Sequence, residues 1–247
     1  MCRLSSAQRE RLKNEGYLHL PGITPPELRD AALKAINASL GENGLDPALL
    51  TRFRSQSYTP ELQGDACVTD LYNASPLRAI AESLIGAIRP VTRAQVALRF
   101  PAAGPPREPK PHIDGTHSPT NGVLEGTFAS FTALAGVFLS DVAGDYCGNF
   151  TVWPGSHLLL QEYCLKNDPQ SVTPGLPLLD LAAPVQLKVN AGDAILAHHM
   201  LAHSAAGNSS ANVRYAAFFR LSHPEHADSK WECLRNPWLH WPGLAPD

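Results

Sequence analysis

The sequence lacks the features that mark several large classes of protein. Its 20 basic and 23 acidic residues give a formal net charge of −3, which offers no electrostatic attraction to nucleic acid or to an anionic membrane. No apolar run is long enough to span a bilayer, and the first residues hold no apolar signal core. The five cysteines are scattered and form no CxxC pair, which favours free thiols in a reducing compartment. We therefore expect a soluble, cytoplasmic protein that binds neither nucleic acid nor membrane.

The residues that are abundant indicate a loop-rich β domain. A length of 247 residues suits one large domain, and 44% hydrophobic residues can build a sizeable core. The 22 prolines and 18 glycines imply many turns and argue against a helix bundle. We expect residues 1–247 to form a single domain, with helical support over 1–90, a β core over about 91–222 and a C-terminal tail over 223–247.

Three helices are predicted in the first third of the chain. A capping box can begin a helix over residues 5–16, which a glycine ends. Thr24 can cap a second helix over 24–41 that has Pro25 at its first position. A third helix, over 75–86, has an apolar stripe and again a terminal glycine.

Alternation of apolar and polar residues begins at residue 91 and predicts the first core strand. One face, from Thr92 to Phe100, is apolar, and the other carries Gln95 and Arg99. In a sandwich the polar face normally contacts solvent. The other interpretation is that Gln95 and Arg99 line a polar pocket inside a barrel. Further strands are predicted over 17–20, 128–139, 150–153, 185–189, 194–203 and 214–220.

The segment His112-Ile113-Asp114 has the strongest chemical signal. A histidine and an aspartate two residues apart on a strand point to the same side. With one more histidine they form a 2-His-1-carboxylate set, which suits non-haem Fe(II) with positions open for O₂ and a co-substrate. The polar loop that follows, residues 115–126, is a candidate cover for the substrate.

Three later histidines are candidates for the third ligand, namely His198, His199 and His203. His198 and His199 must point to opposite faces of a strand, so we expect one packed and one exposed. The position of Arg214 favours His203, because a turn at residues 207–210 would place the two on neighbouring antiparallel strands of one hairpin. An arginine fixed there can hold the distal carboxylate of an α-keto diacid.

These motifs together resemble the phytanoyl-CoA dioxygenase-like (PhyH) family of Fe(II)/2-oxoglutarate-dependent oxygenases. The correspondence extends from about residue 8 to about residue 222. The matching segments are 15–22, 112–114, 148–157 (ending in Pro-Gly-Ser-His), 192–193, His203 and Arg214.

The resemblance implies a mainly β fold, a double-stranded β-helix (jelly-roll, cupin-like) core with supporting N-terminal α-helices. It also implies three iron ligands that form the catalytic centre, and polar contacts to the co-substrate or substrate. The iron ligands are then His112, Asp114 and His203; Arg214 binds the C5 carboxylate of 2-oxoglutarate, and Gln95 and Arg99 are the further candidate contacts.

The implied reaction consumes O₂ and 2-oxoglutarate, releases succinate and CO₂, and hydroxylates an unactivated C–H bond of a small-molecule metabolite. Ascorbate is expected to stimulate it. Because Asp114 is retained, no coordination position is opened for a halide, and halogenation is not expected. Two alternatives stay open: a cupin-like metalloenzyme that does not use 2-oxoglutarate, and a non-catalytic jelly roll that binds a small molecule.

Overall fold

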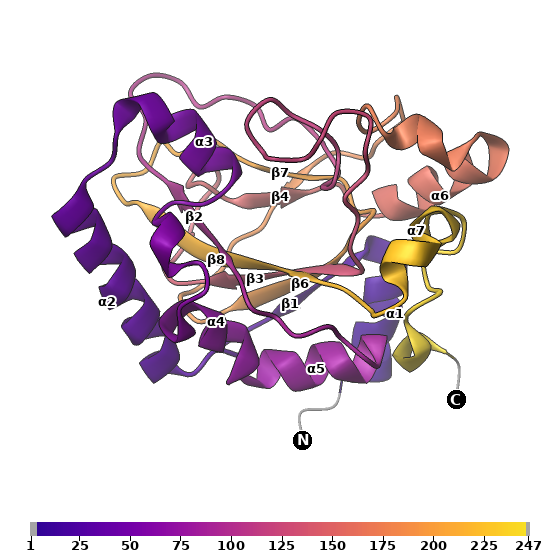
Figure 1. Ribbon diagram of the computed structural model, residues 1–247, viewed down its shortest axis with the longest axis horizontal. Helices are drawn as coiled ribbons and strands as arrows, with labels where there is room; N and C mark the ends of the chain where they lie inside the picture. Colours follow the sequence, from indigo (N-terminus) through magenta and orange to yellow (C-terminus); the bar gives the residue numbers. More distant parts are fainter. Residues whose placement is uncertain (1–3, 246–247) are drawn as a thin grey trace.

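The computed structural model describes residues 4–245, and its centre consists of two antiparallel β-sheets (Figure 1). The strands are β1 (Tyr17–Leu20), β2 (Gln95–Arg99), β3 (Ala133–Phe138), β4 (Phe150–Val152), β5 (Val185–Gln186), β6 (Ala194–His198), β7 (His203–Ala205) and β8 (Arg214–Leu221). The larger sheet has the order β1-β6-β3-β8-β2 and the smaller sheet the order β5-β4-β7. This two-sheet core agrees with the predicted jelly roll.

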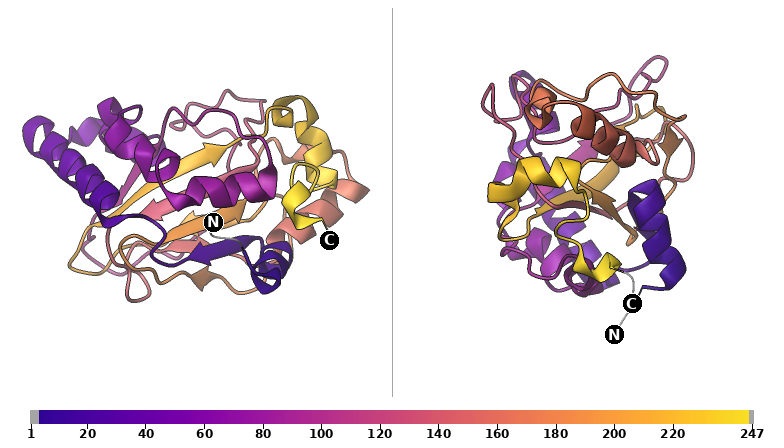
Figure 2. Two further views of the ribbon diagram at one scale, coloured as in Figure 1. Left: turned by 90° about the horizontal axis from the view of Figure 1, so that it is seen from below. Right: turned by 90° about the vertical axis from the view of Figure 1, so that its right-hand side faces the viewer.

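Helices surround the two sheets. They are α1 (Ser6–Glu15), α2 (Pro26–Asn43), α3 (Leu50–Ser55), α4 (Ala66–Asn73), α5 (Pro76–Ile85), α6 (Ser156–Lys166) and α7 (His226–Arg235), with short 3₁₀ turns at Pro47–Leu49, Pro60–Leu62, Pro169–Val172 and Pro242–Leu244. Helices α2, α4 and α5 cover the outer face of the larger sheet (Figures 1 and 2). Among the described residues, no helix is both long and apolar enough to cross a membrane.

Alternation along β8 divides the apolar side chains between two clusters. Ala217, Phe219 and Leu221 point outward and pack with the helices. Ala216 and Phe218 point inward and pack with residues of the smaller sheet. One face of each strand is therefore buried under helices, while the other is directed to the space between the sheets.

Helices α1 and α5 form as predicted. The capping box at α1 uses Ser5 and Gln8, and Gly16 ends the helix in the left-handed conformation at φ +83°. Helix α5 buries its apolar stripe, which includes Leu84, and its last turn is capped by the backbone of Gly86. Both helices are specified locally, by residues at their ends and by periodicity.

Helix α2 differs from the prediction at both ends. The side chain of Thr24 makes no capping hydrogen bond, and Pro25 is the N-cap. The backbone N–H of Thr24 instead donates to the carbonyl of Gly192 at 2.9 Å, so a tertiary contact places this residue. The helix continues through Gly41 and ends before Gly44, whose φ is +67°.

The segment predicted as one strand over 194–203 forms two strands in different sheets. Strand β6 pairs with β1 and β3, whereas β7, which begins at His203, pairs with β4. Strand β8, which begins at Arg214, pairs with β2 and β3. The prediction that His203 and Arg214 lie on paired strands of one hairpin is therefore wrong. The chain leaves the larger sheet after residue 198, and it returns to that sheet after the turn at 207–210.

The prediction that one of His198 and His199 is exposed is also wrong, because both are buried. They lie at the end of β6, where the chain leaves the sheet, and alternation no longer directs them to opposite faces. The C-terminal tail covers them: His198 contacts the rings of Trp238 and Trp241, at centroid distances of 4.8 and 5.5 Å. The aromatic residues of the tail therefore serve to close this end of the molecule.

Candidate active site

His112, Asp114 and His203 converge at one place between the sheets. The backbones of His112 and His203 exchange hydrogen bonds, at N···O distances of 3.1 and 2.9 Å, which hold the two residues side by side. Asp114 lies two residues further along. Its Oδ1 is 3.7 Å from Nε2 of His112 and 3.6 Å from Nε2 of His203.

These atoms fit a single metal ion. Two ligands at about 2.1 Å on opposite sides of a cation are about 4.2 Å apart, and both measured distances are shorter than that. Nδ1 of His203 is 3.0 Å from the carbonyl oxygen of Leu201. That contact orients the ring and directs Nε2 to the metal position. Two imidazoles and one carboxylate are the donors that non-haem Fe(II) uses.

Arg220 orients the carboxylate of Asp114. Its Nη2 donates to Oδ2 of Asp114 at 2.8 Å and to Oε1 of Gln95 at 3.1 Å. Oδ1 is thereby left to the histidines. Burial alone would raise the pKa of Asp114, but Arg220 and the two histidines outweigh it and hold that pKa well below its usual range. The carboxylate is therefore ionised and ready to bind a cation.

Two further arginines carry positive charge into the same space, Arg214 from a buried and Arg99 from a half-buried position. Arg214 is 2% exposed, and it donates from Nε to the carbonyl of Gly148 at 2.8 Å and from Nη1 to the carbonyl of Ala97 at 3.0 Å. Burial and the neighbouring Arg99 lower the pKa of Arg214. Within residues 4–245, no acidic side chain pairs with either guanidinium. Because an unpaired buried charge is costly, this pair indicates a site for an anion.

Gly148 lets the two arginines approach each other. Its φ is +76°, and a Cβ atom built on it would lie 2.8 Å from Cβ of Arg99 and 3.1 Å from Cβ of Arg214. Both distances are too short for an alanine without movement of its neighbours. A glycine at this position is therefore required by contact as well as by backbone conformation.

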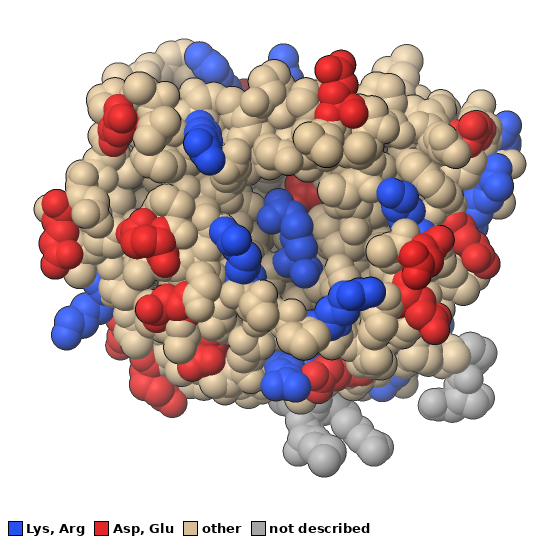
Figure 3. Space-filling model, in the orientation of Figure 1, with Lys and Arg blue, Asp and Glu red and all other residues tan. Residues whose placement is uncertain are grey.

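All six predicted site residues line one cavity of about 970 Å³. Figure 3 shows a hollow near the centre of this face, with basic side chains in and around it. The interpretation of Gln95 and Arg99 as pocket-lining residues is therefore confirmed over the solvent-facing alternative. Of the charged residues that line the cavity, one is acidic, Asp114, and four are basic: Arg54, Arg99, Arg214 and Arg220.

The loop over residues 115–126 forms one wall of the cavity and is held against α3. Gln56 donates from Nε2 to the carbonyl of Thr120 at 2.7 Å, and Ser55 bonds to the same residue. Within the loop, Asn121 donates to the carbonyl of Thr116 at 2.8 Å. The loop is therefore part of the cavity wall, and that it covers the substrate stays a prediction.

Arg220 and two aromatic residues were not identified from the sequence. Arg220 lies six residues after Arg214 on β8, so the period of two already put both side chains on one face. Phe150 and Phe218 line the cavity, whereas Phe131 lies under Arg220, with its ring centre 5.7 Å from the guanidinium carbon. Such aromatic residues lie within long apolar runs of the sequence. Hydrophobic periodicity cannot tell a side chain that lines a cavity from one that packs in the core.

Comparison with known proteins gives one family and many similar structures. The family model described as phytanoyl-CoA dioxygenase (PhyH) matches residues 12–216. No curated protein matches the chain. The crystal structure of SnoN, a non-haem α-ketoglutarate-dependent epimerase from nogalamycin biosynthesis, is 23% identical, with a TM-score of 0.57, over 86% of this chain and 80% of that one.

Two other solved structures have the same fold. HygX from Streptomyces hygroscopicus, with nickel and 2-oxoglutarate bound, is 17% identical, with a TM-score of 0.60, over 90% of this chain and 88% of that one. ThoJ, a non-haem monooxygenase in complex with nickel, is 18% identical, with a TM-score of 0.59, over 88% and 77%. The chain therefore belongs to the phytanoyl-CoA dioxygenase family of oxygenases, which use Fe(II), 2-oxoglutarate and O₂.

Proposed function

We propose that this protein hydroxylates an unactivated C–H bond of a small-molecule metabolite, with conversion of 2-oxoglutarate and O₂ to succinate and CO₂. The observation that carries the proposal is a cavity lined both by a 2-His-1-carboxylate cluster and by two arginines that pair with no acidic side chain in the described part of the chain, Arg214 buried and Arg99 half-buried. A ligand that has a keto-acid at one end and a carboxylate at the other matches both features.

In this proposal, His112, Asp114 and His203 hold Fe(II), and Arg214 binds the C5 carboxylate of 2-oxoglutarate. Bound iron supplies O₂ activation, coupled to oxidative decarboxylation of the co-substrate. Arg214 is already held by two backbone carbonyls, so its position does not have to be ordered when the anion binds. Arg220 keeps Oδ2 of Asp114 occupied and thereby orients Oδ1 toward the metal.

Gln95 and Arg99 lie beside this arrangement on β2. The side-chain oxygen of Gln95 accepts from Arg220, so its amide N–H groups are the part that faces a ligand. Arg99 adds a second positive charge next to Arg214. We assign both to contacts with 2-oxoglutarate or with a polar group of the substrate.

The size of the cavity supports a small-molecule substrate. A volume of about 970 Å³ holds the co-substrate and leaves room for a metabolite, since ligand sites usually span roughly 300–1,000 Å³. Its walls include parts of three segments, residues 41–75, 101–126 and 160–183, which set the shape of the free space. The first contributes through α3 and the residues after it. We also propose that the chain works as one domain, because the helices of its first third share a core with the strands.

Enzymes with this fold differ in the reaction that they carry out on the substrate. Two of the similar structures are an epimerase and a carbocyclase, and both names describe reactions other than hydroxylation. We choose hydroxylation because it needs no side chain beyond those already described. Retention of Asp114 argues against halide binding at the metal.

The test is succinate formation by purified protein with Fe(II), ascorbate, O₂, 2-oxoglutarate and a panel of small metabolites. We expect His112→Ala to abolish turnover. Arg214→Gln removes a charge-assisted hydrogen bond of about 1.5–3 kcal/mol and should raise the KM for 2-oxoglutarate about 10- to 100-fold. Arg78→Gln, which removes an exposed arginine paired with Glu82, is the control and should leave both values unchanged.

Three results would contradict the proposal. Turnover that survives His112→Ala would remove the metal site from the mechanism. Metal-dependent activity without consumption of 2-oxoglutarate would favour the cupin-like alternative. Failure to bind Fe(II) or Ni(II) at all would favour a non-catalytic binding protein.

A further inference from the structure

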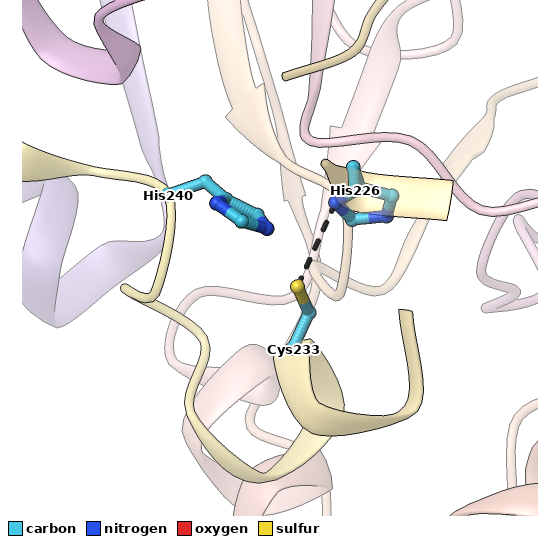
Figure 4. Close-up of side chains that lie close together, drawn as sticks. All are labelled: His226, Cys233 and His240. Atoms are coloured by element: carbon cyan, nitrogen blue, oxygen red, sulfur yellow. Dashed lines mark hydrogen bonds between the residues drawn. The ribbon is translucent and has the colours of Figure 1, made fainter. Parts of the chain in front are cut away.

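A second group of potential metal ligands lies at the C-terminal end of the molecule, outside the cavity. His226 begins α7, Cys233 lies two turns further along the same helix, and His240 returns to them after the helix ends (Figure 4). Residues seven apart on a helix share a face, so the first two are brought together by the helix itself. None of the three lines the active-site cavity, and the proposed reaction uses none of them.

The three side chains are buried and close to one another. Their exposed fractions are 1% for His226, 2% for Cys233 and 7% for His240. One ligand atom from each lies within 4.8 Å of the others. Sγ of Cys233 is 3.7 Å from Nδ1 of His226, close to the about 3.6 Å expected for a tetrahedral zinc ion with Zn–S of about 2.3 Å and Zn–N of about 2.05 Å.

The hydroxyl of Ser229 lies beside the cluster and is hydrogen-bonded to it. Its Oγ is 2.7 Å from Nε2 of His240 and 3.8 Å from Sγ of Cys233, and it donates to the carbonyl of Glu225 at 2.8 Å. A cation within the cluster would meet one sulfur and two nitrogens. A thiolate with two imidazoles selects a borderline or soft metal such as Zn²⁺ over Mg²⁺ or Ca²⁺.

The surroundings of His226 suit a metal ligand. Nε2 of His226 is 2.9 Å from Oγ of Ser130, a contact that orients the ring and directs Nδ1 toward Cys233. Metal-binding histidines characteristically make such a contact with their other nitrogen. Nδ1 is also 3.2 Å from Oγ1 of Thr132, and a bound metal would replace that hydroxyl as its partner.

We propose that His226, Cys233 and His240 form a structural Zn²⁺ site, with a water held by the Ser229 hydroxyl as the fourth ligand. On binding, the thiol of Cys233 gives its proton to solvent and coordinates as the thiolate. The metal would join α7 and the C-terminal tail to the segment before β3, which carries Ser130. It would thereby hold together the part of the molecule that covers His198 and His199.

The experiment separates this site from the active site. His112→Ala/Asp114→Ala protein lacks the proposed iron site, so zinc that it retains belongs elsewhere. After incubation with Zn²⁺ under reducing conditions and dialysis, we expect about one zinc per chain by elemental analysis. Adding Cys233→Ala should remove that zinc. Adding Cys164→Ala, a buried cysteine of α6 outside the cluster, should retain it.

A spectroscopic measurement keeps the test independent of how well the variants fold. Wild-type protein loaded with Co²⁺ should show the near-ultraviolet absorption of a thiolate–cobalt bond, and Cys164→Ala should show it equally. Absence of this absorption in the wild-type protein overturns the proposal. So does zinc content that is unchanged by Cys233→Ala. Neither result bears on turnover of 2-oxoglutarate, so this proposal and the proposed function can fail separately.

Discussion

Replacement of Gly148 by alanine should weaken 2-oxoglutarate binding without removing any group that touches the ligand. The new Cβ would lie 2.8 Å from Cβ of Arg99 and 3.1 Å from Cβ of Arg214. One or both arginine backbones must then move, and the bond from Nε of Arg214 to the carbonyl of residue 148 must lengthen or break. We therefore expect the arginine pair to lose its alignment with the metal.

Two separate costs determine how far Gly148→Ala lowers the free energy of unfolding. A non-glycine residue at φ +76° costs about 1–2 kcal/mol, and overpacking of this kind costs about 1–3 kcal/mol. The free energy of unfolding should therefore fall by about 2–5 kcal/mol. A misaligned charge-assisted hydrogen bond of about 1.5–3 kcal/mol corresponds to 2-oxoglutarate affinity that is about 10- to 100-fold weaker.

Gly126→Ala is a matched control. Gly126 has φ +75°, almost equal to that of Gly148, and a Cβ atom there would contact nothing within 4 Å. This control should therefore show the backbone cost alone, about 1–2 kcal/mol, and unchanged 2-oxoglutarate affinity. The assays are urea unfolding and calorimetric titration of 2-oxoglutarate into Ni(II)-loaded protein. If folded Gly148→Ala protein binds 2-oxoglutarate within twofold of the wild type, the arginine pair is not the carboxylate site.

Three further predictions concern other parts of the molecule. Arg220→Leu should weaken metal binding about 10- to 100-fold, the usual effect of losing an outer-shell partner, because Oδ2 of Asp114 loses its donor; metal titration checks this, and an unchanged affinity would exclude the orienting role. Burial lowers the pKa of His157 to about 4, so its neutral form stabilises the fold above about pH 6.5 and that contribution, about 3 kcal/mol, is lost as the pH falls toward 4. Urea unfolding at pH 7 and at pH 4.5 should show a smaller loss in His157→Gln than in the wild type, and equal losses would refute the assignment. Leu84→Ala, a fully buried position of α5, should lower the free energy of unfolding by about 2–5 kcal/mol and leave 2-oxoglutarate affinity unchanged; a large change in affinity would mean that the helical cover and the cavity are coupled.

Local patterns in the sequence determined much of the site. The period of two put Gln95 and Arg99 on one face of β2, and put Arg214 and Arg220 on one face of β8. These features depend only on residues a few positions apart, so they can be read without knowing what the strands pair with. His112 and Asp114 do lie together, but the predicted strand is wrong: His112 forms an isolated bridge with His203, and Asp114 lies in the turn that follows.

The tertiary structure decided what the patterns could not. His203 and Arg214 share a cavity although they lie in different sheets, because the chain crosses between the sheets and strand pairing is a long-range property. The contact of Arg220 with Asp114 joins residues 106 positions apart. The group of His226, Cys233 and His240 forms because a helix ends and the tail folds back over it. Sequence periodicity assigns a side chain to a face, whereas only packing of distant segments determines which side chains meet there.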